Sequence, residues 1–160
     1  MNRKAEGDSK GDFKIIATNR KARHDYEILQ SFEAGLSLLG SEVKSMRAGK
    51  ATLKDAYAVP RGNEIFLLNM HISPYDKTGF GGHEPERPRK LLMHAKEIGK
   101  LIALTESKGI TLIPLKVYFR GKYAKVDLGI CRGKKSHDKR AAIMERDIRR
   151  DMEREIKRRK

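Results

Sequence analysis

The apolar residues between Phe13 and Cys131 mostly follow the two-residue repeat of half-buried β-strands. A strand predicted over 25–36 carries a bend near Gln30, and Gly35 permits a bulge in it. The other apolar or alternating runs cover 13–17, 53–59, 65–72, 110–119 and 124–130. Turn-forming residues at 60–63 and 120–122 join the last four runs into two predicted hairpins.

Three segments follow a helical pattern instead. Asn19 can cap a helical turn that ends near Arg23. A helix of two or three turns is predicted from Ser41 as N-cap to Gly49 as the stop. The helix with the clearest pattern is predicted from a proline at 88 to a glycine at 109, with apolar residues at a period near 3.6.

Five or six strands, with the long helix inserted before the last pair, predict a mainly β fold with accessory helices. Such a strand number closes most economically as a small Greek-key barrel, and the OB-fold is its common nucleic-acid-binding form. We therefore expect an OB-like barrel over 13–131. The polar stretch 1–12 is expected to be a flexible N-terminal arm.

Residues 132–160 form a basic tail in which the strand pattern stops. Met144, Ile148, Met152 and Ile156 are spaced four apart, as in a helix with a thin apolar stripe. A short helix without packing is marginal in water. We expect this C-terminal tail to be disordered alone and helical when its partner covers it.

Charge indicates what that partner is. The 160 residues carry a formal net charge of +15, concentrated at the two ends of the chain, which points to nucleic acid. A solubilising surface is a weaker alternative, because solubility alone would not need one sign of charge concentrated at both termini. A membrane surface is weaker still, because the tail lacks a Trp, Phe or Leu face for insertion. The sequence has no signal peptide and no membrane-length apolar run, so we expect a cytoplasmic protein.

Candidate chemistry adds little to this interpretation. Cys131 is the only cysteine, and none of the five histidines is spaced for metal binding, so no metal or cofactor is expected. The glycines of the 73–88 loop do not match a phosphate-binding motif. His137 beside Asp138 and Lys139 resembles a general acid-base group next to a cation, but a charged, flexible segment positions it poorly for a nuclease. We expect no catalytic residues and no enzymatic activity.

Four segments together carry a resemblance to a known family. In chain order they read NRKARHDYEI from Asn19, FEAGLSLLGSEVKSMRAGKATLKDAY from Phe32, HEPERPRKLLMH from His83 and GKKSHDKR from Gly133. They closely resemble the small protein B family, also called SmpB or SsrA-binding protein, over 19–140.

The resemblance implies an OB-like barrel that binds the tRNA-like domain of tmRNA and acts in trans-translation. With alanyl-tmRNA, which elongation factor Tu carries, the protein would enter the A site of a stalled ribosome in place of a tRNA anticodon arm. The incomplete protein would then be tagged for degradation and the ribosome rescued. A monomer is expected. An RNA nuclease and a structural protein of the ribosome are the alternatives.

The resemblance also implies which residues act. Asn19, Glu33, Leu92 and Lys125 match family positions associated with tmRNA binding, although Leu92 also lies on the core face of the predicted long helix. Other basic residues are candidate phosphate contacts, for which a solvated basic face is the alternative: Lys21, Arg23, Lys44, Arg47 and Lys50. The junction to the tail would contact the decoding centre of the small subunit through Lys134, Lys135, His137, Asp138, Lys139 and Arg140.

Overall fold

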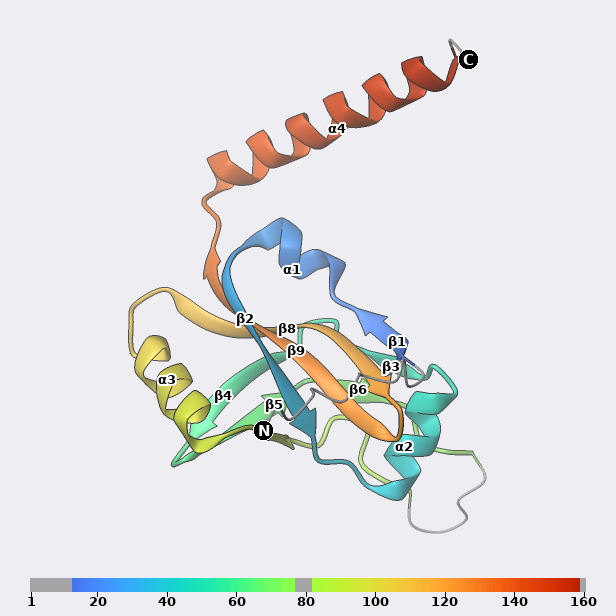
Figure 1. Cartoon of the computed structure of the whole chain (residues 1–160), viewed down its shortest axis with the longest axis vertical. Coiled ribbons are helices and arrows are strands. Elements are labelled where there is room, and N and C mark those ends of the chain that lie inside the picture. Colours follow the sequence, from blue (N-terminus) through green and yellow to red (C-terminus); the bar gives the residue numbers. More distant parts are fainter. Residues whose placement is uncertain (1–12, 77–81, 159–160) are drawn as a thin grey trace, which may run out of the picture.

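The computed structural model describes residues 13–76 and 82–158 and has the element order shown in Figure 1. The expected arm at 1–12 lies outside the described residues. The strands are β1 (Phe13–Thr18), β2 (Tyr26–Leu36), β3 (Ala51–Thr52), β4 (Tyr57–Arg61), β5 (Glu64–Leu68), β6 (His71–Ile72), β7 (Arg89–Leu92), β8 (Ile110–Arg120) and β9 (Tyr123–Gly133). The helices are α1 (Arg20–Asp25), α2 (Gly40–Arg47), α3 (Ala95–Thr105) and α4 (Ser136–Arg158).

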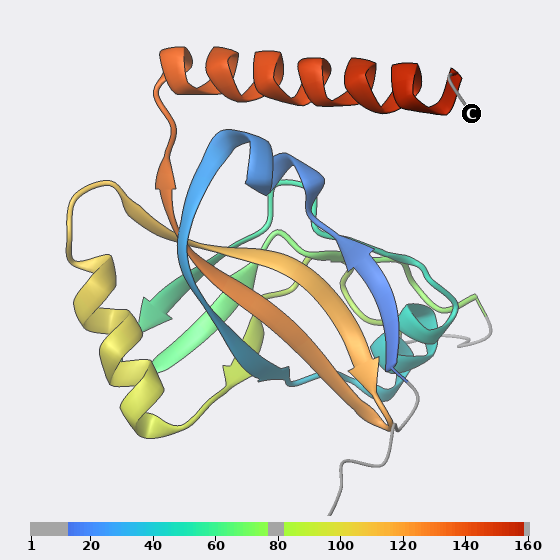
Figure 2. The same ribbon diagram turned by 45° about the horizontal axis from the view of Figure 1, so that its top comes forward.

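The main sheet is antiparallel, and its pairings lead back to the strand where they began. In the order β8, β4, β5, β7, β2, β9, each strand pairs with the next, and β9 pairs with β8 again. β1 is added outside this ring along β8, and β3 pairs with β6. Figures 1 and 2 show the strongly curved sheet with α3 and α2 at its margins. The predicted mainly β fold with accessory helices is confirmed, and the pairing fits an OB-like arrangement.

The core lies inside the curved sheet and is aliphatic. Side chains alternate across each strand, so Val117 on β8 and both Val126 and Leu128 on β9 are fully buried. The register shifts between Ile28 and Gln30, which confirms the bend predicted in β2. A second shift follows Pro114, which has no N–H to donate to a ladder and therefore suits a bulge.

The prediction for the long helix is wrong at its start. Residues 89–92 form β7, which pairs with β5 and with the end of β2, and α3 begins only at Ala95. The sequence gives no strand pattern here, because Leu91 and Leu92 are adjacent and the other inward-facing residue of β7 is the charged Arg89. The hydrogen bonds to β5 and β2 make this segment a strand. At the start of α3, the Glu97 carboxylate accepts a hydrogen bond from the His94 N–H.

Further boundaries differ from the predictions. α3 ends at Thr105, before the predicted stop at Gly109. The strand expected from Leu53 begins at Tyr57, because a turn closed by the Ala56 N–H on the Leu53 carbonyl precedes it. α2 has Leu39 rather than Ser41 at its N-cap. The Glu42 carboxylate accepts from the Leu39 N–H at 2.7 Å and satisfies that end of the helix. The predicted hairpins are confirmed as β4–β5 and β8–β9. The run predicted over 65–72 is divided, however, because Asn69 has a φ of 58°: β5 ends at Leu68, and β6 pairs with β3.

The basic tail forms α4, which projects from the end of β9 beside α1 (Figure 2). Its apolar stripe is exposed, with Met144 69% and Ile156 62% accessible. The tail is therefore helical in this structure although its apolar side chains are exposed. That this helix forms only on binding stays a prediction.

Candidate RNA-binding surface

Three of the residues expected to bind RNA lie together in one cavity. Glu33 on β2, Leu92 on β7 and Lys125 on β9 all line a cavity of about 490 Å³. Gly35 on β2 is paired with Leu92 on one side and with Lys125 on the other, which fixes the three strands side by side. A Cβ on Gly35 would lie 3.1 Å from the Cβ of Leu92, so the glycine permits this close approach.

Glu33 is held by neighbouring side chains. The Tyr118 hydroxyl donates to its carboxylate, and the cations of Arg120 and Lys125 lie 3.4 and 3.6 Å from it. The hydrogen bond from Tyr118 is the main cause that lowers the pKa of Glu33, and both cations add to it. The carboxylate is thus ionised, and the cations of Arg120 and Lys125 balance its charge. It holds these two cations and the Tyr118 phenol at the edge of the cavity. Glu33 is therefore not an isolated negative charge at this surface.

Leu92 is available to a ligand. Its side chain is 52% exposed, whereas the preceding residue, Leu91, is 1% exposed. Leu91 and Leu92 are neighbours on β7, so their side chains point to opposite faces of the strand. The alternative interpretation, in which Leu92 lies on the core face of a helix, is therefore wrong.

Asn19 lies elsewhere, at the start of α1. Its carboxamide oxygen accepts from the Ala22 N–H at 3.0 Å, and its nitrogen donates to the Pro114 carbonyl at 3.1 Å. The predicted capping role is confirmed. The side chain joins α1 to β8, and it does not line the Glu33 cavity.

The junction to the tail is attached to α1. The Lys134 N–H donates to the Asp25 carbonyl at 2.9 Å, and its ammonium donates to the Arg23 carbonyl at 3.3 Å. The Lys139 ammonium lies 3.9 Å from the Asp25 carboxylate. A hydrogen bond from His24 is the main cause that lowers the pKa of Asp25. α1 and the junction therefore form one basic surface, at which Lys21 and Arg23 are also exposed.

Beyond this attachment the junction is open. The side chain of His137 is 94% exposed and lies 3.8 Å from Asp138, which is itself 60% exposed. Lys135 and Arg140 are exposed as well. Groups presented in this way suit contact with a large partner, and they lack the enclosed geometry of an acid-base pair.

The three basic residues near α2 each lie against a partner in the chain. The Lys50 ammonium is 2.7 Å from the Asp76 carboxylate. Lys44 lies over the Tyr75 ring at 5.4 Å, and Arg47 lies over the Phe119 ring at 5.3 Å. They form a separate patch that shares no lining residue with the Glu33 cavity.

A buried ionic network was missed by the sequence analysis. Glu42 on α2 and Arg89 on β7 are both 0% exposed, and the Arg89 Nε donates to Glu42 Oε1 at 2.9 Å. Arg87 donates twice to the same carboxylate, at 2.9 and 2.7 Å. The Arg89 guanidinium also donates to the carbonyls of Met70 and Pro85. The network ties α2 to the strand that presents Leu92. An acidic residue in the first turn of α2 was the only sequence signal for it.

Other chemistry is sparse in the part of the chain that the structure describes. Cys131 is buried, and burial raises the pKa of its thiol to about 11. Across 13–76 and 82–158, no three of the histidine, cysteine and carboxylate side chains are grouped as metal ligands. No helix within the same ranges is long and apolar enough to span a membrane.

The fold and this surface define a small, basic, mainly β protein that presents cationic side chains at a strand cavity and along a terminal helix. Comparison with known families identifies it further. The family model described as SmpB protein matches residues 16–158. The chain therefore belongs to the SmpB family, and the predicted resemblance is confirmed.

Individual relatives agree with this assignment. The chain is 56% identical to an SsrA-binding protein of Microcystis aeruginosa over 146 residues, covering 91% of this chain and 95% of the relative. It is 53% identical to that of Carboxydothermus hydrogenoformans over 144 residues, covering 90% and 97%. A solved structure described as "tmRNA-SmpB: a journey to the center of the bacterial ribosome" is 50% identical, with a TM-score of 0.64, over 74% of this chain and 84% of that one.

Proposed function

We propose that this protein binds the tRNA-like domain of tmRNA through the cavity of Glu33, Leu92 and Lys125. The convergence of these three side chains, from strands far apart in the sequence, is the observation that carries the proposal. Membership of the SmpB family supports it. Lys125 and Arg120 supply cations for phosphate, and exposed Leu92 supplies an apolar surface for an unstacked base.

The proposal extends to ribosome rescue. With alanyl-tmRNA, carried by elongation factor Tu, the protein enters the empty A site of a stalled ribosome in the place of a tRNA anticodon arm. The residues of the junction, from Lys134 to Arg140, contact the decoding centre, and α4 enters the vacant mRNA channel. The protein acts in the cytoplasm as a monomeric adaptor without catalysis or cofactor, so that tmRNA supplies the degradation tag. The open junction and the exposed cations of α4 support this part.

Binding to tmRNA tests the first part directly. We expect the full chain to bind tmRNA more tightly than an ordinary tRNA, with a salt dependence that counts the phosphate contacts. Glu33→Gln is expected to weaken binding, because it removes the charge that holds Arg120 and Lys125. Glu64→Gln is the matched control, since Glu64 is also a partly exposed carboxylate paired with a lysine, outside the cavity. Equal binding by the two variants would contradict the assignment of the site.

Truncation tests the second part. A chain that ends after Gly133 keeps β9 and the Glu33 cavity and lacks α4. We expect it to bind tmRNA normally and to support no tagging in a translation assay on an mRNA without a stop codon. Loss of tmRNA binding on truncation would refute the division of roles. RNA turnover that His137→Ala abolishes would instead establish a nuclease.

A further inference from the structure

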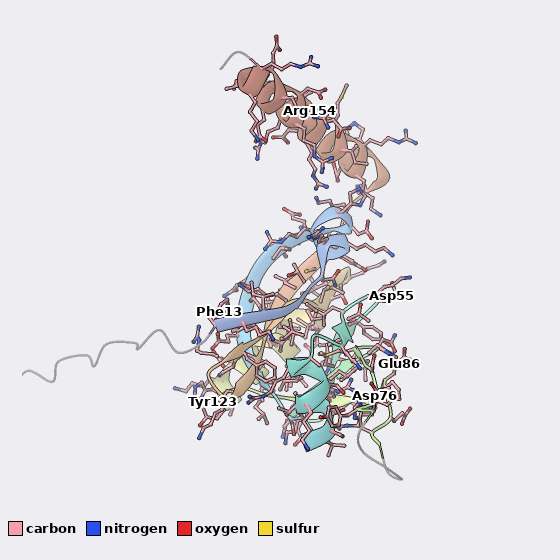
Figure 3. The ribbon with its side chains drawn as sticks, turned by 90° about the vertical axis from the view of Figure 1, so that its right-hand side faces the viewer. Phe13, Asp55, Asp76, Glu86, Tyr123 and Arg154 are labelled. Atoms are coloured by element: carbon pink, nitrogen blue, oxygen red, sulfur yellow. The ribbon has the colours of Figure 1, made fainter. Side chains whose placement is uncertain are left out.

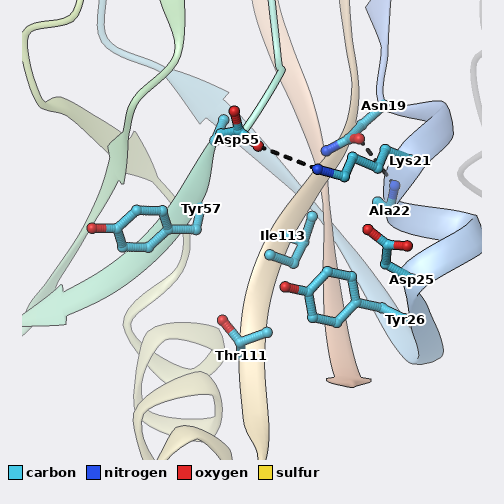
Figure 4. Close-up of a pocket in the computed structure, with 10 residues that line it drawn as sticks. Asn19, Lys21, Ala22, Asp25, Tyr26, Asp55, Tyr57, Thr111 and Ile113 are labelled. Atoms are coloured by element: carbon cyan, nitrogen blue, oxygen red, sulfur yellow. Dashed lines mark hydrogen bonds and ion pairs between the residues drawn. The ribbon is translucent and has the colours of Figure 1, made fainter. Parts of the chain in front are cut away.

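A second cavity lies between α1 and the barrel, on residues that the Glu33 cavity does not include (Figure 4). Its volume is about 240 Å³. α1 and the start of β2 form one side, and the turn before β4 forms the other. β8 lies between them. The junction to the tail is attached to the same α1, so the cavity opens beside the basic surface of Lys21 and Arg23.

The lining is suited to a flat aromatic ligand. Tyr26 and Tyr57 lie on opposite sides of the cavity, and Ile113, which is 6% exposed, is one of the residues between them in Figure 4. Thr111 adds a hydroxyl group on the same strand as Ile113. Aromatic rings stack on nucleobases of any sequence, because every base has a π-face.

One carboxylate at this cavity is held in position and only weakly engaged. Asp55 has a φ of 59°, a left-handed conformation in which the turn before β4 holds it. The Lys21 ammonium reaches across from α1 to within 3.6 Å of its carboxylate, as the dashed line in Figure 4 shows. Both side chains are more than 60% exposed, and such ion pairs contribute little to stability. A ligand can therefore displace Lys21 from Asp55 at low cost.

The donor pattern of guanine fits this carboxylate. The Watson–Crick edge of guanine presents an N1–H and an N2 amine side by side, which two carboxylate oxygens can accept together. Adenine presents an acceptor at N1 and loses one of these bonds. Lys21, once released, lies close enough to meet the phosphate of the same nucleotide.

We propose that this cavity binds one unstacked guanine of an RNA, with Tyr26 and Tyr57 beside the base, Asp55 on its Watson–Crick edge and Lys21 on its phosphate. This inference rests on the proposed function only in taking RNA as the source of the base. The protein would then hold RNA at two places, at the Glu33 cavity and beside the junction to the tail. The second contact would fix α1, and with it the direction in which the tail leaves the barrel.

Nucleotide titration of the isotope-labelled full chain tests this by NMR. We expect GMP to shift the amide signals of Tyr26, Tyr57 and Thr111 and to bind about tenfold more tightly than IMP, which lacks the N2 amine. Inorganic phosphate is the control for the anion alone and should leave these three signals unchanged. The proposal would be overturned if only the signals of exposed lysines and arginines changed and if phosphate changed them as much as GMP does.

Two variants assign the effect to Asp55. Asp55→Asn keeps the size of the side chain, and asparagine tolerates a positive φ, so the fold should be retained. It should bind GMP no more tightly than IMP. Asp76→Asn is the matched control, because Asp76 is also an exposed aspartate paired with a lysine, at a separate place on the same side of the molecule (Figure 3). Retention of the GMP preference in Asp55→Asn, or its loss in Asp76→Asn, would refute the assignment.

Parallel measurement of tmRNA binding separates this inference from the proposed function. A chain that binds tmRNA but shows no GMP-dependent shift at the cavity would refute the inference alone. A chain that binds GMP at the cavity but does not bind tmRNA would refute the proposed function alone.

Discussion

Replacing Glu42 by glutamine should strongly destabilise the protein. The change leaves the shape of the side chain almost unaltered but removes the negative charge that Arg87 and Arg89 share. Arg89 is 0% exposed and would become an uncompensated buried cation. Removing one partner of a buried ion pair costs about 3–5 kcal/mol. For a chain of this size that corresponds to a fall in the melting temperature of about 10 °C.

The control is an exposed ion pair whose lysine is the neighbour of Arg89 on β7. Lys90 follows Arg89 on β7 and pairs with Glu64, and both of those side chains are more than 40% exposed. Glu64→Gln should therefore change the free energy of unfolding by less than about 1 kcal/mol. Urea unfolding, followed by near-ultraviolet circular dichroism of the tyrosines, measures both variants without interference from α4. Equal stabilities of Glu42→Gln and Glu64→Gln would refute the reasoning.

The same network makes stability depend on pH in a defined direction. Burial by itself raises the pKa of Glu42, but hydrogen bonds from Arg87 and Leu39 and the charges of Arg89 and Arg87 outweigh it, so the net pKa lies below the ordinary value. A depressed carboxyl pKa stabilises the folded state above the unfolded pKa. That stability is lost as the pH falls through the folded value. The difference in unfolding free energy between the wild type and Glu42→Gln should therefore become smaller as the pH falls into the acid range.

Three further outcomes can be measured on single variants. Leu92→Ser should weaken tmRNA binding with little loss of stability, whereas Leu91→Ala, one residue away on the buried face, should cost about 2–5 kcal/mol of unfolding free energy. Lys125→Ala should weaken tmRNA binding and lower the salt slope by about one, while exposed Lys108→Ala, outside the cavity, should leave both unchanged. Cys131, buried and with its thiol pKa raised to about 11, should resist alkylation at neutral pH until urea unfolds the chain.

Local features of this fold could be predicted from the sequence because short-range interactions decide them. The Asn19 cap depends on a hydrogen bond to a residue three positions away. The β8–β9 hairpin follows from an apolar run and an alternating run on either side of a tight turn in which Gly121 has a φ of 59°. The helical spacing in 136–158 is equally local. The family resemblance, confirmed over 16–158, supplied the candidate site residues that no periodicity could supply.

The tertiary structure decided the rest, because long-range pairing is not encoded in any one segment. The adjacent Leu91 and Leu92 fit a helical stripe, and only pairing with β5 and β2 made 89–92 a strand with Leu92 exposed. Glu42 and Arg89 are 47 residues apart, so their ion pair exists only once the chain has folded. The meeting of Glu33, Leu92 and Lys125 depends in the same way on the pairing of Gly35 with two strands. The sequence determined which side chains are candidates for binding RNA, and the pairing of the strands decided which of these candidates lie together.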